Sequence, residues 1–321
     1  MEQKIKILVT GAAGFIGSHT TKKLLELGYS VVGVDNFNDY YDPKAKERNI
    51  EKFLDNPGFK LYREDIGNFP KMAEIFKEEK FDKVCHLAAR AGVRPSIIDP
   101  FLYEEVNVKG TLNMLELSRI NEIKNFVFAS SSSVYGNNEK IPFSETDNVD
   151  FPISPYAATK KACELLAYTY HHLYSLKCTG LRFFTVYGPC GRPDMAPFLF
   201  VDAIFQGREF KRFGDGTAKR DFTYIDDIVS GIVSALEKNL GYEIINLGNN
   251  KPVEINYFIS LIEKLVDKKA AIKEYPKQPG DVDITYADIG KAQKLLDYSP
   301  KTSIEEGMRM FVEWYLENRV E

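Results

Sequence analysis

Tyr156 and Lys160 lie four residues apart in the sequence, directly after Pro155. If this segment is helical, the two side chains share one helix face, so the ammonium group can lie close to the phenol oxygen. A free phenol, with a pKa of about 10, is a poor base at neutral pH, but a neighbouring cation favours the tyrosinate. The pair could therefore take a proton from a hydroxyl group. The alternative is an ordinary surface pair of Tyr and Lys.

A run of four serines, Ser130–Ser133, favours the catalytic interpretation. It follows an apolar segment, Phe126–Ser130, that is typical of a buried strand. In an open α/β sheet, ligands bind at the carboxyl ends of the strands. A hydroxyl at this place could hydrogen-bond a substrate oxygen as its charge changes.

A glycine-rich turn follows the first predicted strand and begins the first helix. Gly11, Gly14 and Gly17 have the spacing G-x-x-G-x-x-G, with Phe15 and Ile16 between the last two. Glycines let the backbone approach a pyrophosphate, and the amides at a helix N-terminus favour its negative charge. Asp35, at the end of the second strand, can accept hydrogen bonds from an adenosine ribose and would repel a 2′-phosphate. An ordinary glycine turn is the alternative, but the whole pattern predicts bound NAD rather than NADP.

Further positions are predicted to contact the cofactor. Asp65 and Ile66 follow a strand-like segment and could reach the adenine. Leu87, Ala88 and Ala89 end another strand with small residues, which suits close approach of the cofactor but would also suit tight packing of a helix on the sheet. The remaining predicted cofactor residues are Asn36, Asn107 and Lys160.

These residues need a scaffold, and the alternation of apolar patterns predicts one. Short strands alternate with helices, which indicates βαβ units and an α/β fold with a doubly wound parallel sheet (Rossmann). The predicted strands are Ile5–Thr10, Ser30–Val34, Phe59–Tyr62, Lys83–Leu87, Phe126–Ser130 and Glu243–Leu247. The predicted helices are Ser18–Leu27, Phe69–Lys77, Val106–Ile120, Ala157–Leu173 and Ile225–Leu236.

After about Thr185 the sequence becomes rich in Pro and Gly, which indicates a second, smaller α/β domain. Because the chain returns to the sheet, the second domain is predicted to be discontinuous. Residues 1–185 with 222–250 are assigned to the NAD-binding Rossmann domain, and residues 186–221 with 251–321 to the second domain, to which the family resemblance described below gives the UDP-sugar.

Composition excludes several classes of protein. The 321 residues include 42 Lys and Arg against 46 Asp and Glu, a net charge of −4, which argues against nucleic-acid binding. Four isolated cysteines, no signal peptide and no apolar run that could span a bilayer predict a cytoplasmic protein without a membrane partner. No side-chain spacing predicts a metal site, and Lys44–Arg48 is interpreted as a solvated charged face.

Across essentially the whole chain, the sequence resembles the NAD-dependent nucleotide-sugar epimerases and dehydratases, which are extended short-chain dehydrogenases/reductases. The motifs are TGAAGFIG, SSSSVYG at 130–136, SPYAATK at 154–160 and RDFTYIDD at 220–227. The resemblance implies that Tyr156 is the catalytic base, Lys160 its electrostatic partner and Ser131 the hydroxyl facing the substrate. It places Ser132 and Ser133 near the sugar of a UDP-sugar.

The residues after Ser131 distinguish reactions within the family. Dehydratases typically carry an Asp-Glu pair there, and decarboxylating members a Glu before the Val-Tyr. This chain has Ser132 and Ser133 and offers no carboxylate. The resemblance therefore favours oxidation and re-reduction at C4 of the sugar, with no net redox change.

Three segments resemble the UDP-glucuronate 4-epimerases: 35–42, 191–196 and 278–282. The resemblance assigns Thr185 and Arg192 to the sugar carboxylate, and the planar fork of Arg suits that group. Such contacts would keep a 4-keto-glucuronate from losing CO₂. Without the resemblance, Arg192 would be interpreted as a solvated loop cation. The run Arg90–Ser96 departs from this group, which typically has Gln first and Tyr sixth.

The same resemblance places Arg220 at the UDP diphosphate and Phe213 against the uracil. Gln278 and Thr185 stand where UDP-galactose epimerases commonly have Arg and Asn, which disfavours UDP-glucose. A UDP-glucose or UDP-N-acetylglucosamine 4-epimerase stays open, as does a non-enzymatic NAD-binding sensor. The intact set of Ser131, Tyr156 and Lys160 argues against the sensor. The family implies a homodimer.

Overall fold

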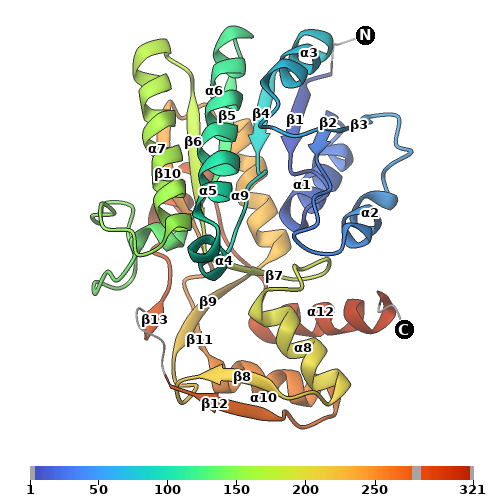
Figure 1. The fold of residues 1–321 in the computed structure, drawn as a ribbon, viewed down its shortest axis with the longest axis vertical. Coiled ribbons are helices and arrows are strands. Elements are labelled where there is room, and N and C mark those ends of the chain that lie inside the picture. The colour runs from blue at the N-terminus through green and yellow to red at the C-terminus, as the bar shows by residue number, and fades with distance from the viewer. Residues whose placement is uncertain (1–3, 277–282, 319–321) are drawn as a thin grey trace.

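A seven-stranded parallel sheet forms the larger part of the molecule (Figure 1). The computed structural model describes residues 4–276 and 283–318. The strand order is β10-β6-β5-β4-β1-β2-β3, and every neighbouring pair is parallel. The strands are β1 (Lys6–Thr10), β2 (Ser30–Asp35), β3 (Phe59–Arg63), β4 (Lys83–His86), β5 (Asn125–Ser131), β6 (Cys178–Phe183) and β10 (Tyr242–Leu247).

Helices cover both faces of this sheet. On β1, Ile7 and Val9 pack into one buried cluster and Leu8 into another, because successive strand residues point to opposite faces. The first cluster lies under α1 (Phe15–Glu26) and α9 (Ile225–Glu237), and the second under α3 (Phe69–Glu79), α6 (Gly110–Ile120) and α7 (Pro155–Tyr174). The predicted α/β class with a doubly wound parallel sheet is confirmed.

Two helices begin differently from the prediction. The first starts at Phe15, not Ser18, so Gly17 lies in its first turn. The segment Val106–Ile120, predicted as one α-helix, instead comprises the end of a π-helix (Glu104–Lys109) and α6, and the short helix α5 (Pro100–Tyr103) precedes it. The first amides of a helix lack intrahelical partners, so glycines there cost less than in the middle of a helix.

The second region follows β6 and lies below the large sheet in Figure 1. Its central strand β9 (Lys219–Tyr224) pairs with β7 (Thr185–Tyr187), β11 (Pro252–Glu254) and β13 (Ile284–Thr285), and β8 (Phe210–Phe213) pairs with β12 (Ile272–Tyr275). The helices of this region are α8 (Ala196–Gln206), α10 (Ile255–Val266) and α12 (Ile304–Asn318). A further helix, α11 (Gly290–Leu296), packs against β10 and α9.

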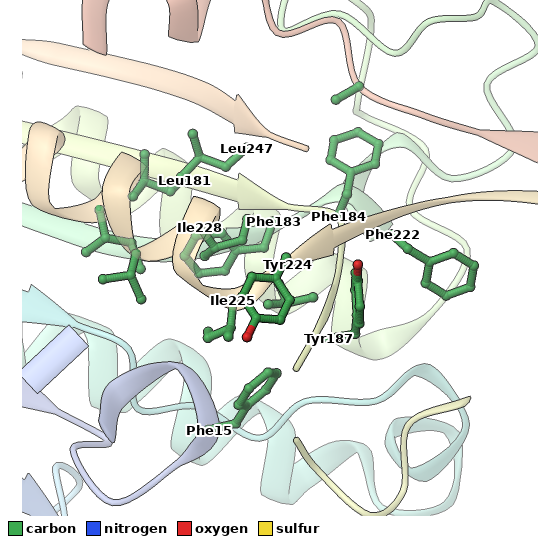
Figure 2. Close-up of a cluster of buried hydrophobic side chains, with 14 of the residues drawn as sticks. Phe15, Leu181, Phe183, Phe184, Tyr187, Phe222, Tyr224, Ile225, Ile228 and Leu247 are labelled. Atoms are coloured by element: carbon green, nitrogen blue, oxygen red, sulfur yellow. The ribbon is translucent and has the colours of Figure 1, made fainter. Parts of the chain in front are cut away.

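One apolar core joins the two regions. The cluster under α1 and α9 continues into the second region through β7 and β9. Figure 2 shows Phe15 of α1 pointing towards Ile225 and Tyr224, at the junction of β9 and α9. The junction between the regions is therefore a packed interior, and residues contributed by both can be held at fixed positions.

Candidate active site

The glycine turn lies against the end of β4. Gly11 has a φ of 70°, a left-handed conformation that favours glycine. A Cβ atom at Gly11 would lie 2.8 Å from the Ala88 amide nitrogen, and one at Gly17 would lie 1.9 Å from the Gly11 carbonyl oxygen. No other residue type fits at these two positions without moving backbone. The turn is therefore built for close backbone approach.

A cavity of about 430 Å³ opens in front of this turn. All five predicted turn residues line it, as do Leu87, Ala88 and Ala89 on the neighbouring strand. Behind this wall, His86 is buried between the hydroxyls of Thr10, at 2.8 Å, and Thr111, at 3.1 Å. Burial, with a contribution from the charge of Lys160, lowers the pKa of His86 to about 3, so the ring is neutral.

Asp35 and its neighbours line the cavity beside the glycine turn. The Asp35 carboxylate accepts hydrogen bonds from the Ala13 amide at 3.1 Å and the Phe37 amide at 2.9 Å. Asn36 donates a hydrogen bond of 2.6 Å to Asp65. These residues line the cavity together with Ile66. The carboxylate of Asp35 is held by the backbone at the end of β2, as a ribose acceptor would need to be.

Tyr156, Lys160 and Ser131 line the same cavity. Tyr156 and Lys160 lie in the first turns of α7, which Ser154 caps by accepting a hydrogen bond of 3.1 Å from the Ala157 amide. Lys160 is 5% exposed and donates a hydrogen bond of 2.9 Å to the Ala129 carbonyl oxygen on β5. The cap of α7 and the contact with β5 thus bring the phenol, the ammonium group and the serine run together.

The serine run ends β5 at the cavity wall. Ser131 Oγ lies 3.2 Å from Ser133 Oγ and accepts a hydrogen bond from the Ser133 amide, which starts a short 3₁₀ helix, Ser132–Tyr135. All three of Ser131, Ser132 and Ser133 line the cavity, and none of them adds a carboxylate.

Thr185 of β7 and Arg192 also line the cavity. The Arg192 side chain is 19% exposed, so it is not a solvated loop cation. Burial by itself lowers the pKa of its guanidinium, but hydrogen bonds and charge from Asp194 outweigh that effect and the pKa is raised. Arg192 is therefore a charged group facing a partly enclosed space.

Three predicted residues within the described part of the chain, Asn107, Phe213 and Arg220, do not line the cavity. Asn107 lies one layer behind it, donating hydrogen bonds to the Arg90 carbonyl oxygen and to Thr159. Phe213 of β8 lies under the Arg94 guanidinium, at 4.6 Å, and Arg220 of β9 donates to the Lys219 carbonyl oxygen at 3.0 Å. Gln278 lies outside the described residues.

The prediction of a solvated face at Lys44–Arg48 is wrong at Lys46. This residue lies on the inner side of α2 (Pro43–Glu51), is 4% exposed, and lines the cavity. Its ammonium group donates to the Asn38 carbonyl oxygen at 2.9 Å and to Asn38 Oδ1 at 3.1 Å. Lys44 and Arg48 are exposed as predicted. The helical period distinguishes them, because Lys46 shares the face of the buried Ile50.

Sequence reasoning also missed Tyr40 and Arg90 as cavity residues. Both lie in segments singled out above, Tyr40 in 35–42 and Arg90 in a run that departs from the related epimerases. Neither segment has a period or spacing that indicates which side chain faces a ligand.

Neither a metal site nor a membrane-spanning helix is found in the part of the chain that the structure describes. Within residues 4–276 and 283–318, no group of three or more His, Cys, Asp and Glu side chains could hold a metal ion. Over the same residues, no helix is both long enough and apolar enough to cross a membrane.

Comparisons with known proteins agree with this geometry. A UDP-glucuronate 4-epimerase from Thermodesulfobacterium geofontis is 50% identical over 312 residues, which cover 97% of this chain and 96% of the relative. The crystal structure of a UDP-glucuronic acid 4-epimerase from Bacillus cereus in complex with UDP-glucuronic acid and NAD superposes with a TM-score of 0.92 at 40% identity, covering 98% of this chain and 99% of that one.

A UDP-glucose 4-epimerase from Thermotoga maritima, solved with UDP-glucose, superposes with a TM-score of 0.90 at 34% identity, covering 98% of this chain and 99% of that one. The family model described as GDP-mannose 4,6 dehydratase matches residues 8–311. With the model matched over nearly the whole sequence and relatives this similar, the chain belongs to the NAD-dependent nucleotide-sugar epimerase and dehydratase family of extended short-chain dehydrogenases/reductases.

Proposed function

We propose that the protein interconverts UDP-glucuronate and UDP-galacturonate by epimerisation at C4 of the sugar, with bound NAD. One observation carries the proposal: a single cavity joins the glycine turn, the set of Tyr156, Lys160 and Ser131, and Arg192. A nucleotide cofactor, a hydroxyl to be oxidised and a carboxylate each find a matching group along that cavity.

The residues fit NAD. The turn has no room for a Cβ at Gly11 or Gly17, and Asp35 presents its carboxylate at the end of β2, where a 2′-phosphate would be repelled. When bound, NAD supplies a hydride acceptor for C4 and later returns the hydride.

The protein's own groups move the proton. Tyr156 takes the proton of the C4 hydroxyl as the hydride leaves, and the ammonium of Lys160 stabilises the charged phenol. Ser131 hydrogen-bonds the C4 oxygen as it becomes a ketone. The 4-keto sugar turns over in the cavity, and Tyr156 returns the proton when the hydride adds to the opposite face. Ser132 and Ser133 provide no acid to expel a hydroxyl, which favours epimerisation over dehydration.

The carboxylate end of the substrate is assigned to Thr185 and Arg192, and the UDP end to Phe213, Arg220 and Gln278. We propose that the chain comprises an NAD-binding domain, residues 1–185 with 222–250, and a UDP-sugar domain, residues 186–221 with 251–321. In support of it, β10 returns to the large sheet beside β6.

A homodimer formed through α6 and α7 is part of the proposal. Monomeric proteins rarely expose large contiguous apolar patches, and these helices expose several apolar side chains. They are Leu112, Leu165, Tyr168 and Leu173. Sedimentation at the mass of a single chain would contradict the dimer. We also propose a cytoplasmic location, since all four cysteines are unpaired.

The deciding experiment incubates the protein with UDP-glucuronate and follows the anomeric protons by NMR. We expect signals of UDP-galacturonate to appear until equilibrium is reached, and UDP-glucose and UDP-N-acetylglucosamine to be poorer substrates. Turnover of UDP-glucose without turnover of UDP-glucuronate would favour the hexose epimerase. NAD binding without turnover of any of the three sugars would favour the sensor.

Replacing Gly17 with alanine should abolish retention of NAD, because the new Cβ would lie 1.9 Å from the Gly11 carbonyl oxygen and force the turn open. NAD released from denatured protein gives the occupancy. Gly207→Ala is the control for an added methyl group outside the turn: Gly207 has a positive φ of 67°, unlike Gly17, and a Cβ there meets no atom within 4 Å. It should lose about 1–2 kcal/mol of stability and keep its NAD. Equal NAD content in the two variants would contradict the role of the turn.

A further inference from the structure

Asp194 holds one edge of the Arg192 guanidinium. Asp194 Oδ1 accepts a hydrogen bond from Arg192 Nε at 3.0 Å, and Oδ2 accepts one from Nη2 at 2.5 Å. Two parallel hydrogen bonds to one carboxylate fix the plane of the guanidinium as well as its position. The pair is only partly exposed, 19% for Arg192 and 36% for Asp194, so solvent does not fully screen it.

Tyr40 completes the clamp from a distant part of the chain. Its hydroxyl lies 3.1 Å from Asp194 Oδ2 and 2.9 Å from the Ala91 carbonyl oxygen. Arg192 and Arg90 each lie 5.3 Å from the centre of the Tyr40 ring. Asp194 is thus tied to the wall of the cavity, and rotation of the arginine about its long side chain is opposed.

The third guanidinium nitrogen is left available. Arg192 Nη1 makes no hydrogen bond to a described residue. Some side-chain nitrogens of this protein are both buried and without a partner, but Arg192 Nη1 is not one of these buried atoms. It is therefore accessible in a side chain that lines the cavity. The clamp occupies the Nε edge and presents the opposite end of the fork to a ligand.

We propose that Asp194 and Tyr40 are positioning residues that hold Arg192 in the one orientation in which it keeps the sugar carboxylate from being lost. The inference rests on the proposed function. Oxidation at C4 makes the substrate a β-keto acid. When the C5–C6 bond that carries the carboxylate stands perpendicular to the plane of the C4 ketone, this bond breaks, CO₂ leaves and the electron pair forms the C4–C5 enolate, which takes a proton at C5. A guanidinium held in a fixed position and plane opposes the movement of the carboxylate into that orientation.

This role differs from ordinary charge attraction. Asp194 carries the same charge as the substrate carboxylate, so it cannot improve affinity by attraction and partly neutralises Arg192. Because Asp194 lies beside the site although it weakens the attraction of Arg192 for the substrate, we expect it to act on the orientation of the substrate carboxylate, and hence on which product forms.

The test compares wild type, Asp194→Asn and Arg192→Ala with UDP-glucuronate, measuring by NMR the ratio of decarboxylated UDP-pentose products to UDP-galacturonate. Asparagine keeps the shape of Asp194 but loses one charge-assisted acceptor, so we expect the ratio to rise about tenfold. Tyr40→Phe should raise it less, and Arg192→Ala at least as much as Asp194→Asn. Because UDP-glucose has no carboxylate, any residual turnover of it should change less than twofold in Asp194→Asn.

Glu47→Gln is the matched control, since Glu47 makes a similar two-bond pair with Arg63, at 2.6 and 2.8 Å, and does not line the cavity. Its product ratio should equal that of wild type. A rise with Arg192→Ala but none with Asp194→Asn or Tyr40→Phe would overturn the inference alone. A lower KM for UDP-glucuronate in Asp194→Asn, with an unchanged product ratio, would also overturn the inference. Asp194 would then only compete with the substrate carboxylate for Arg192. Absence of UDP-glucuronate turnover by the wild-type protein would overturn the proposed function and the inference with it.

Discussion

Replacing Tyr156 with phenylalanine is expected to lower kcat for UDP-glucuronate by about 10²–10⁴-fold, the usual contribution of a positioned acid or base. Only the phenol oxygen is removed. The ring still packs edge to face with Tyr103, at 6.2 Å between centroids, and the backbone amide still donates to Ser96 Oγ at 3.1 Å. Binding of UDP-glucuronate, measured by calorimetry, should therefore change by only a few fold, and the loss should appear in kcat.

The matched control is Tyr170→Phe, on the same helix. The Tyr170 hydroxyl donates to Glu116 at 3.0 Å, and Tyr170 does not line the cavity, so its loss should leave kcat within twofold of wild type. If Tyr156→Phe retained more than a tenth of the wild-type kcat, another group would have to be the base. Ser131 would then be the first residue to test, because it lines the same cavity.

The second large effect concerns a buried ion pair under the serine run. Arg182 of β6 donates to Glu164 of α7 through Nε and Nη2, both at 2.8 Å, and the side chains are 3% and 2% exposed. Ser130 Oγ donates to the same carboxylate at 2.6 Å. Glu164→Gln leaves a buried cation without its counter-charge, so we expect the free energy of unfolding in urea to fall by about 3–5 kcal/mol.

Two further variants test whether the stability lost in Glu164→Gln comes from the buried charge of Arg182. Glu313→Gln breaks an exposed helical pair with Arg309, so we expect it to cost about 0.3–0.5 kcal/mol. Replacing Glu164 and Arg182 together by methionine removes both charges, and should recover most of the stability lost in Glu164→Gln. A loss below about 1 kcal/mol in Glu164→Gln would mean that Arg182 finds another way to be solvated.

The same ion pair explains a strand that the sequence did not predict. In β6 all six residues are buried, but Gly180 and Arg182 interrupt the apolar run. Glycine is needed because a Cβ at Gly180 would lie 2.6 Å from both Phe128 and Ile244, on the two neighbouring strands. Arginine is tolerated because Glu164 faces it. Both reasons depend on partners far away in the sequence, so no local pattern could indicate the strand.

The sequence by itself determined the parts of this protein whose physics is local. The order of strand, glycine turn, helix and Asp35 depends on backbone geometry within a few residues, and the approach of Tyr156 to Lys160 depends on the helical repeat. The sequence could therefore place the cofactor turn and the catalytic pair before any coordinates.

Only the tertiary structure decided how the carboxylate end of the cavity is arranged. Tyr40 and Asp194 are 154 residues apart, and their contact at 3.1 Å exists because the second region packs onto the sheet through one shared core. The inward position of Lys46 likewise follows from the face on which α2 packs. Such contacts depend on which surfaces meet when the chain folds, and no spacing along the chain encodes them.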